Sequence, residues 1–342
     1  MIRLEPQPMN TVADLRQALQ KAIQIEFSTI PPYLYALFSL REGTNAAVRS
    51  RITAVALEEM THMALACNVL NAIGGNPVLA DASVVPTYPG PLPYDIGGDD
   101  GERFLVSLLP FSKEAMAQAI HIEEPEEPLV FPEAFEVAPS YQTIGQFYAA
   151  LDQALRDLPT REWADPARNQ LTDHPFLAGE LFPVTGYDAA SRAIHRIVSE
   201  GEGTTRSPLD FEGEVAHYYR FEEIRRDRVL RKDPSVVEGF TWGPPLGVEW
   251  DEVMPVIADP GEHDFSQDPP ARAAQDACDR AFTRMVQELH RAVNGEAGRL
   301  GNAVRAMFDL RMAARAAVAT PLKYSAQSAG PAFRFRPALT AS

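Results

Sequence analysis

The spacing of apolar residues along the chain predicts a mostly helical protein. Apolar residues recur every three to four positions over residues 12–41, and a second stripe of this kind runs through residues 46–73. Gly74 and Gly75 follow the second stripe and are suited to end that helix. Later stretches repeat the pattern and predict further helices at 187–202, 209–231, 270–294 and 298–318.

A long insertion separates the second and third of these helices, over about residues 75–186. Proline is frequent in its first part, and its patterns predict one helix at 141–158 and strands at Arg103–Phe111 and Ala134–Ala138. We therefore expect a mainly α fold, a four-helix bundle with a long, partly irregular insertion and extra C-terminal helices over about 270–318. The bundle and its additions would form a single domain over residues 1–342.

Two adjacent prolines, Pro31 and Pro32, interrupt the first helical stripe. Proline has no backbone N–H, so the carbonyls of Phe27 and Ser28 lose their usual helical partners. In one interpretation a helix ends here and another begins near Pro31, capped by Thr29. In the other, one kinked helix continues, and the hydroxyl of Ser28 or Thr29 helps the freed carbonyls. The sequence leaves both interpretations open.

Acidic and imidazole side chains lie on the apolar stripes in a repeated pattern. Glu59 and His62 form a Glu-x-x-His pair on the second predicted helix, and Glu214 and His217 form another on the fourth. Three residues along a helix bring both side chains to nearly the same face, so that one pair can hold one metal ion. Two such pairs and a Glu from each of two other helices build a di-iron or di-manganese site in a four-helix bundle.

Single acids on the remaining two helices complete this pattern. Glu26 lies on the apolar stripe of the first helix, where an unpaired carboxylate is costly unless it binds a metal. On the third helix the candidates are Glu200 and Glu202, and Glu202 is preferred because it continues the apolar line. Glu58 is also within reach of His62, but it falls off the stripe. The other histidines have no Glu three positions earlier, and we expect ordinary structural roles for His121, His174, His195, His263 and His290.

Composition and charge narrow the possible functions. The 342 residues are 45% hydrophobic and 23% charged, which is typical of a globular protein. The net charge of −16 argues against nucleic-acid binding and against anionic membranes. We find no signal peptide and no membrane-spanning run. The two cysteines, Cys67 and Cys278, argue against a disulfide framework or a thiolate metal site, and we expect a cytoplasmic protein.

Several segments resemble one known family. The segments EFSTIPPYLYALFSL, EEMTHMALACNVLNAIGGNP, IVSEGEGT and EVAHYYRFEEI are similar to the ferritin-like domain of the VioB and RebD/StaD type iminophenyl-pyruvate dimer synthases. IEEPE, at residues 122–126, resembles a turn of that family. The resemblance covers roughly residues 12–230 and implies metal ligands at Glu26, Glu59, His62, Glu202, Glu214 and His217. Relatives often have Gln at the position of Glu200, and the full synthases are much longer and associated with haem.

These observations predict a di-iron oxidoreductase that uses O2 and acts on a small organic substrate. The family resemblance implies that this substrate is an amino-acid-derived imine. Glu59 and Glu214 would bridge the two iron ions, and Mn or Zn would also suit Glu and His donors. We expect a monomer or small homo-oligomer. Tyr33, Tyr218 and Tyr219 are candidates to line the substrate pocket. The competing hypotheses are a metal-storage protein and a structural module without small-molecule catalysis.

Overall fold

The computed structural model describes residues 9–93, 103–125, 144–165, 167–172, 181–203, 207–237 and 239–337. Its longer helices are α1 (Val12–Ser39), α2 (Ala46–Ala72), α3 (Lys113–Ile122), α4 (Ile144–Arg156), α5 (Tyr187–Glu202), α6 (His217–Arg226), α7 (Pro269–Val293) and α8 (Leu300–Val318). The predicted mainly helical fold is confirmed. The predicted strand at Ala134–Ala138 lies outside the described residues.

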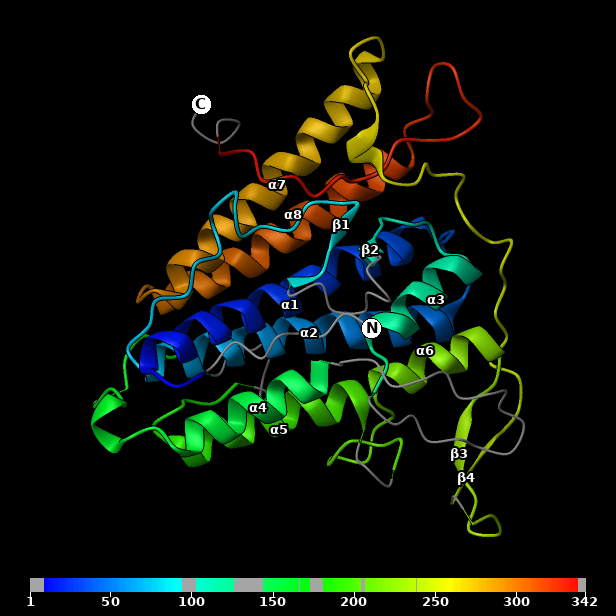
Figure 1. Cartoon of the computed structure of the whole chain (residues 1–342). Helices are drawn as coiled ribbons and strands as arrows, with labels where there is room; N and C mark the ends of the chain where they lie inside the picture. The colour runs from blue at the N-terminus through cyan, green and yellow to red at the C-terminus, as the bar shows by residue number, and fades with distance from the viewer. Residues whose placement is uncertain are drawn as a thin grey trace.

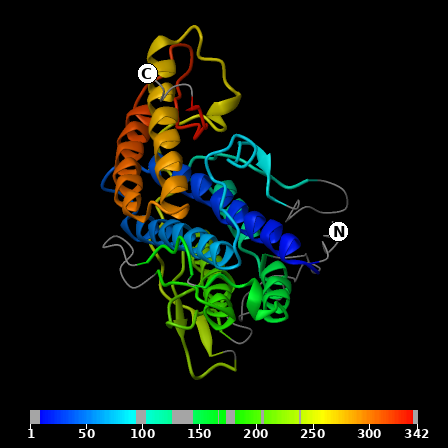
Figure 2. The ribbon, with the colours of Figure 1, turned by 90° about the vertical axis from the view of Figure 1, so that its left-hand side faces the viewer.

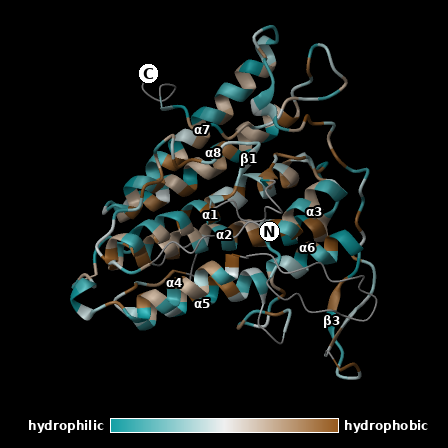
Figure 3. Ribbon diagram, viewed as in Figure 1, coloured by the Kyte–Doolittle hydropathy of each residue, from teal (hydrophilic) through white to brown (hydrophobic). Residues whose placement is uncertain are grey.

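The helices form three layers (Figures 1 and 2). The α1–α2 hairpin is the middle layer, and α7 packs against α8 on one side of it. On the other side α4 packs against α5, and α3 packs against α6. Most helices carry both polar and apolar residues (Figure 3), as expected where one face of a helix is in the core.

Helix α1 begins at a capping box, in which the side chain of Thr11 accepts from the backbone N–H of Asp14 and the carboxylate of Asp14 accepts from that of Thr11. It then continues through both prolines to Ser39 as one helix. The predicted continuity of the helix through Pro31 and Pro32 is therefore confirmed. The hydroxyls of Ser28 and Thr29, however, donate to the carbonyls of Gln24 and Glu26 and not to the two freed carbonyls. The carbonyl of Ser28, which Pro32 deprives of its helical partner, accepts a hydrogen bond of 2.8 Å from the Tyr88 hydroxyl.

The fourth predicted helix, at 209–231, is shorter than expected. Helix α6 begins only at His217, and a bridge between Leu209 and Val215 precedes it. The cause is local, because the carboxylate of Asp210 accepts from the backbone N–H groups of Glu212 and Glu214 and so favours a turn over a helix. After α6 the chain forms a small antiparallel pair, β3 (Leu230–Lys232) with β4 (Phe240–Trp242), which the sequence pattern missed.

The predicted strand at Arg103–Phe111 is reduced to a short element. Only β2 (Leu105–Val106) forms, and it pairs antiparallel with β1 (Gly90–Pro91). Neither small sheet carries the core, which is built mainly from α1, α2 and the helices packed on both sides of them.

Several helices of the layer formed by α3, α4, α5 and α6 begin or end where this layer crosses the middle of α1 and α2, so the layer is interrupted there. The end of α3 at Ile122, the start of α4 at Ile144 and the end of α5 at Glu202 line one small cavity together with Glu26 of α1. Helix α6 begins beside this cavity, because its first residue, His217, forms a cluster with two residues that line the cavity, Glu59 of α2 and Glu123. The interruption therefore brings the ends of four short helices to the buried face of the α1–α2 hairpin.

Candidate metal centre

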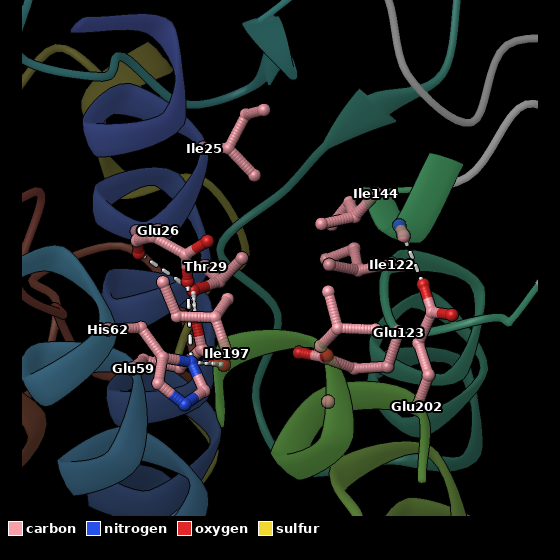
Figure 4. A pocket seen from close by; sticks show the side chains of 13 residues that line it. Ile25, Glu26, Thr29, Glu59, His62, Ile122, Glu123, Ile144, Ile197 and Glu202 are labelled. Atoms are coloured by element: carbon pink, nitrogen blue, oxygen red, sulfur yellow. Dashed lines mark hydrogen bonds and ion pairs between the residues drawn. The ribbon is translucent and has the colours of Figure 1, made fainter. Parts of the chain in front are cut away.

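The buried side chains at this interruption come from four elements. Glu26 lies on α1, Glu59 and His62 lie on α2, Glu123 directly follows α3, and His217 is the first residue of α6. Each of these side chains is buried. Figure 4 shows Glu26 and His62 near one another on α1 and α2, with Glu123 on the opposite side of the cavity.

Glu26, Glu59 and His62 form a first cluster. Nδ1 of His62 lies 3.5 Å from Oε2 of Glu26 and 3.7 Å from Oε1 of Glu59. One candidate ligand atom from each residue lies within 4.8 Å of the others. Two carboxylate oxygens and an imidazole nitrogen at this spacing are a donor set for one divalent metal ion.

Glu59, Glu123 and His217 form a second cluster with the same spacing limit of 4.8 Å. Nδ1 of His217 lies 2.8 Å from Oε1 of Glu59 and 3.6 Å from Oε2 of Glu123. Glu59 therefore belongs to both clusters. The rings of His62 and His217 stack across it, with centroids 5.5 Å apart.

In each imidazole, Nε2 is the ring nitrogen that faces away from the two clusters, and it lies within hydrogen-bonding distance of a further carboxylate. Nε2 of His62 lies 2.7 Å from Oε2 of Glu200, whose other oxygen lies 2.6 Å from Nε of Arg196. Because an ionised carboxylate only accepts hydrogen bonds, Nε2 carries the proton and Nδ1 is left to face the centre.

His217 has an equivalent arrangement on the other side. Its Nε2 lies 2.8 Å from Oε2 of Glu58, and Nη1 of Arg220 lies 2.8 Å from the other oxygen of that carboxylate. Each imidazole ring is thus oriented by a glutamate whose carboxylate is itself bound by an arginine. Such second partners are a common property of metal-binding histidines.

The carboxylates of Glu26, Glu59 and Glu123, called the central carboxylates below, each accept a hydrogen bond from one hydroxyl group. Tyr148 donates to Glu26 over 2.5 Å, Thr29 donates to Glu59 over 2.8 Å, and Tyr33 donates to Glu123. One oxygen of each carboxylate is therefore fixed by the protein. The expectation that Tyr33 lies at the site agrees with this contact, whereas Tyr218 and Tyr219 pack in or against a separate apolar cluster.

The electrostatics of the centre favour a bound cation. Burial and the negative charge of Glu59 raise the pKa of Glu26 to about 7, and the same two causes raise the pKa of Glu123. Burial opposes ionisation of Glu59, but the neighbouring imidazoles of His217 and His62 outweigh it and lower the pKa of Glu59. Burial likewise opposes charge on the two imidazoles, and their carboxylate partners raise both pKa values, led by Glu200 for His62 and by Glu123 for His217.

One atom in particular is without an ordinary partner. Nδ1 of His217 is buried and makes no hydrogen bond of acceptable geometry in the described structure, although Glu59 is close to it. A buried polar atom in this condition is costly unless something else satisfies it. A metal ion would satisfy it, and the donor set therefore fits a metal.

The space beside the carboxylates is small and mostly apolar. A cavity of about 20 Å³ is lined by Ile25, Ile122, Ile144 and Ile197 in addition to the acids. A buried water needs roughly 10–15 Å³ on this measure, so the cavity holds one water-sized group. An organic molecule of several carbon atoms does not fit there in this conformation.

The structure brings together four of the six side chains predicted as ligands, Glu26, Glu59, His62 and His217. Glu214 is exposed in the turn before α6 and lies in neither cluster. The predicted bridging role of Glu214 has no geometric support, because this turn replaces the helix on which that role depended.

Glu202, the remaining predicted ligand, lines the cavity but has another partner. Its Oε1 accepts a 2.7 Å hydrogen bond from the backbone N–H of Gly145 at the start of α4 (Figure 4). A carboxylate at a helix N-terminus is favoured by the helix dipole. A Cβ atom at Gly145 would lie 2.5 Å from this carboxylate, so any larger residue there would displace it from its present position.

Sequence reasoning missed Glu123 as a member of the centre. The signal available was the Ile-Glu-Glu-Pro-Glu motif that begins at residue 122, which places an acid directly after a helical stretch. It also undervalued Glu58 and Glu200, which bind the outer nitrogens of the two histidines.

Comparison with known proteins assigns the fold to a family. The model of the Ferritin-like family matches residues 19–226, which include all five side chains of the two clusters. The chain belongs to the Ferritin-like family. A ferritin like protein from Caulobacter vibrioides has a similar structure, with a TM-score of 0.60 over 91% of this chain and 96% of that one at 23% identity. That likeness supports the fold alone.

Two curated relatives of this Ferritin-like chain are enzymes. Dichlorochromopyrrolate synthase from Lentzea aerocolonigenes is 24% identical over 95% of this chain and 36% of its own length. The 2-imino-3-(indol-3-yl)propanoate dimerase from Chromobacterium violaceum is 26% identical over 64% of this chain and 24% of its own length. The chain thus spans about a third or less of the relatives it matches. Within the described residues, no helix has the length and apolar character needed to cross a membrane.

Proposed function

We propose that this chain is a metal-dependent oxidoreductase with two iron ions, acting on a small organic substrate with O2 as the electron acceptor. The observation that carries the proposal is the position of Glu59, which belongs to both clusters and is faced by Nδ1 of both His62 and His217. A shared carboxylate between two Glu–His donor sets is the arrangement of di-metal carboxylate sites in helical bundles. Manganese and zinc are alternatives for the same donors.

The proposed ligand set differs from the one expected from sequence. Glu26 and His62 would hold one ion, Glu123 and His217 the other, and Glu59 both. Glu123 takes the place expected for Glu214. Iron bound in this set would supply one-electron redox chemistry between an organic substrate and O2.

The protein's own groups prepare the centre for this chemistry. The hydroxyls of Tyr148, Thr29 and Tyr33 each fix one oxygen of a central carboxylate. Glu58 and Glu200 hold the imidazoles with Nδ1 directed inward. The isoleucine side chains around the cavity exclude bulk water and keep the local dielectric low, which strengthens these interactions.

The substrate class we propose is an amino-acid-derived imine or a related small acid. Its support is the similarity to the dimerase that acts on 2-imino-3-(indol-3-yl)propanoate.

The test is metal loading of the purified protein. Wild type incubated anaerobically with Fe(II) and desalted is expected to retain two iron ions per chain, and to consume O2 when air is admitted. Glu59→Gln, which removes the shared carboxylate, is expected to retain much less iron. Glu262→Gln, a change at an exposed acid, is the matched control and is expected to behave like wild type. Equal iron content in wild type and Glu59→Gln would contradict the proposal.

A further inference from the structure

The cavity beside the metal centre is too small for an organic substrate in this conformation. Its volume is about 20 Å³, and the isoleucine side chains that line it leave space for one water-sized group. A diatomic molecule such as O2 is close to that size, whereas the organic molecule that the proposed oxidoreductase acts on is not. Electrons from that molecule must therefore cross a layer of protein, and a side chain that can itself be oxidised would carry them.

Two oxidisable side chains are in direct contact with the central carboxylates. The hydroxyl of Tyr148 donates to Oε1 of Glu26 over 2.5 Å, and the hydroxyl of Tyr33 donates to Glu123. A phenol loses an electron most readily when its proton can move at the same time to a base within hydrogen-bonding distance, and each of these carboxylates is such a base. The third donor, Thr29, has an aliphatic hydroxyl and cannot serve in this way.

Tyr148 is the phenol of this pair that is connected toward the surface. Asp152 lies four residues after it on α4, so the two side chains share one face of the helix with Cβ atoms about 5–6 Å apart. Oδ2 of Asp152 lies 3.3 Å from the hydroxyl of Tyr187, the first residue of α5, which packs along α4 (Figure 1). Tyr148 is 1% exposed, whereas Tyr187 is only half-buried. The ring of Tyr33 packs instead against the buried Phe221.

Asp152 is suited to be the base for Tyr187. Its side chain is buried, and its Oδ1 has no hydrogen-bond partner in the described part of the chain. Nε of Arg156 donates to the hydroxyl oxygen of Tyr187 over 2.9 Å, which leaves the hydroxyl proton for Asp152. Each phenol therefore has a carboxylate of its own, Glu26 for Tyr148 and Asp152 for Tyr187.

We propose that Tyr148 and Tyr187 form a relay that carries electrons, one at a time, from an organic donor at the surface to the metal centre. This inference rests on the proposed function, in which iron oxidised by O2 is the oxidant. In the first step the O–H bond of Tyr148 breaks, its proton passes to Glu26, its electron passes to the oxidised iron, and a neutral phenoxyl radical remains.

The second step moves the radical outward. Tyr148 takes an electron from Tyr187 and regains its proton from Glu26, while the hydroxyl proton of Tyr187 passes to Asp152. The organic donor then gives one electron to the Tyr187 radical, and Asp152 returns the proton. The donor is oxidised by one electron, the iron is reduced by one electron, and both phenols are restored.

Electron paramagnetic resonance tests the first step, on protein loaded with Fe(II) and frozen at intervals after O2 is admitted. A tyrosyl radical is expected in wild type and in Tyr187→Phe, where it cannot leave Tyr148, and its spectrum is expected to narrow when the tyrosine is β-deuterated. Tyr148→Phe is expected to retain iron and to lose the signal. Tyr33→Phe is the matched control, because it removes the corresponding bond to Glu123, and is expected to keep the signal.

Ascorbate tests the second step, because it is an organic one-electron reductant that is too large for the cavity. It is expected to remove the radical from wild type, and to do so roughly ten-fold more slowly in Tyr187→Phe, which is about 1.4 kcal/mol in the barrier. Tyr324→Phe, at a tyrosine that is 79% exposed, is the control and is expected to match wild type. Equal rates in wild type and Tyr187→Phe would refute the role of Tyr187.

The same samples separate failure of the relay from failure of the metal centre. Iron retained without a tyrosyl signal in Tyr187→Phe would overturn the relay alone, and so would a signal that survives in Tyr148→Phe. Loss of the signal in Tyr33→Phe at full iron content would overturn the assignment to Tyr148. Wild type that retains no iron would refute the proposed function, and the relay with it.

Discussion

Oε2 of Glu123 lies 3.6 Å from Nδ1 of His217, whereas Glu214, only three residues before His217 in the chain, is exposed. The Glu-x-x-His spacing brings two side chains together only within a helix, and here the helix begins at His217. One carboxylate partner of this histidine therefore comes from the end of α3, a distant part of the sequence.

Replacing each of these two acids tests which one belongs to the centre. We expect Glu123→Gln to reduce the retained iron from two ions per chain toward one, because the second cluster loses a charged ligand. Glu214→Gln is expected to retain two, and elemental analysis of desalted protein measures both. Iron loss in Glu214→Gln with none in Glu123→Gln would show that the bound protein follows the sequence pattern and not this geometry.

Metal binding is expected to release more protons at pH 6 than at pH 8. The pKa of Glu26 is raised from 4.5 to about 7, so this acid is largely protonated at pH 6 and must lose its proton to bind a cation. The raised pKa values of the two histidines and of Glu123 add further protons to those released on metal binding. Calorimetry in two buffers of different ionisation enthalpy counts the protons, and a difference of about one is expected.

The raised pKa of Glu26 also makes the stability of the metal-free protein depend on pH. The raised pKa of Glu26 means that the folded chain keeps this proton when the unfolded chain has lost it. The contribution of Glu26 to the free energy of unfolding therefore falls as the pH rises from about 4.5 to about 7. If the proton counts at pH 6 and pH 8 were equal, the assignment of a raised pKa to Glu26 would be refuted.

Gly145→Ala is expected to destabilise the protein by about 0.5–1.5 kcal/mol, the usual contribution of one hydrogen bond. The new Cβ would lie 2.5 Å from the carboxylate of Glu202, which must then leave the N-terminus of α4. Gly298→Ala is the control, because no atom lies within 4 Å of a Cβ at that position. Chemical denaturation of both variants measures the difference in the free energy of unfolding. Equal stabilities would show that the hydrogen bond between Gly145 and Glu202 contributes nothing to stability.

A double-mutant cycle tests how α1 tolerates its prolines. Tyr88→Phe leaves the Ser28 carbonyl without its donor and is expected to cost about 1–3 kcal/mol of unfolding free energy. In a Pro32→Ala background, residue 32 regains an N–H that can bond this carbonyl, so the same change is expected to cost less. Additivity of the two changes, within about 0.5 kcal/mol, would refute this relationship.

The long helices were predictable because their apolar residues recur over many turns. Helices α1, α2, α7 and α8 lie close to their predicted bounds, and Glu26, Glu59 and His62 follow from the stripes on the first two. The stripe also exposes its own limit. It selects residues that face the core, and so it rejected Glu58, which binds His217 from the adjacent face of α2.

The rest of the centre depends on contacts that spacing does not encode. The carboxylate of Asp210 stabilises a turn that delays α6, and nothing in the helical period reveals this competition. Glu123 joins His217 only because α3 packs against α6 in the folded protein. Sequence reasoning could therefore predict the metal centre as a class of site, whereas part of its ligand set required the tertiary structure.

One of the two clusters lies within the α1–α2 hairpin and the other does not, so we expect the two clusters to form at different stages of folding. The first cluster is complete within one hairpin, between residues 26 and 62, so its contacts close a shorter stretch of chain than those of the second. The second must wait until the ends of α3 and α6 reach α2 from far along the chain. Local contacts form faster and non-local ones require closure of long loops. We expect hydrogen exchange of the metal-free protein to protect the hairpin around Glu26 and His62 more strongly than the helix ends beside Glu123 and His217.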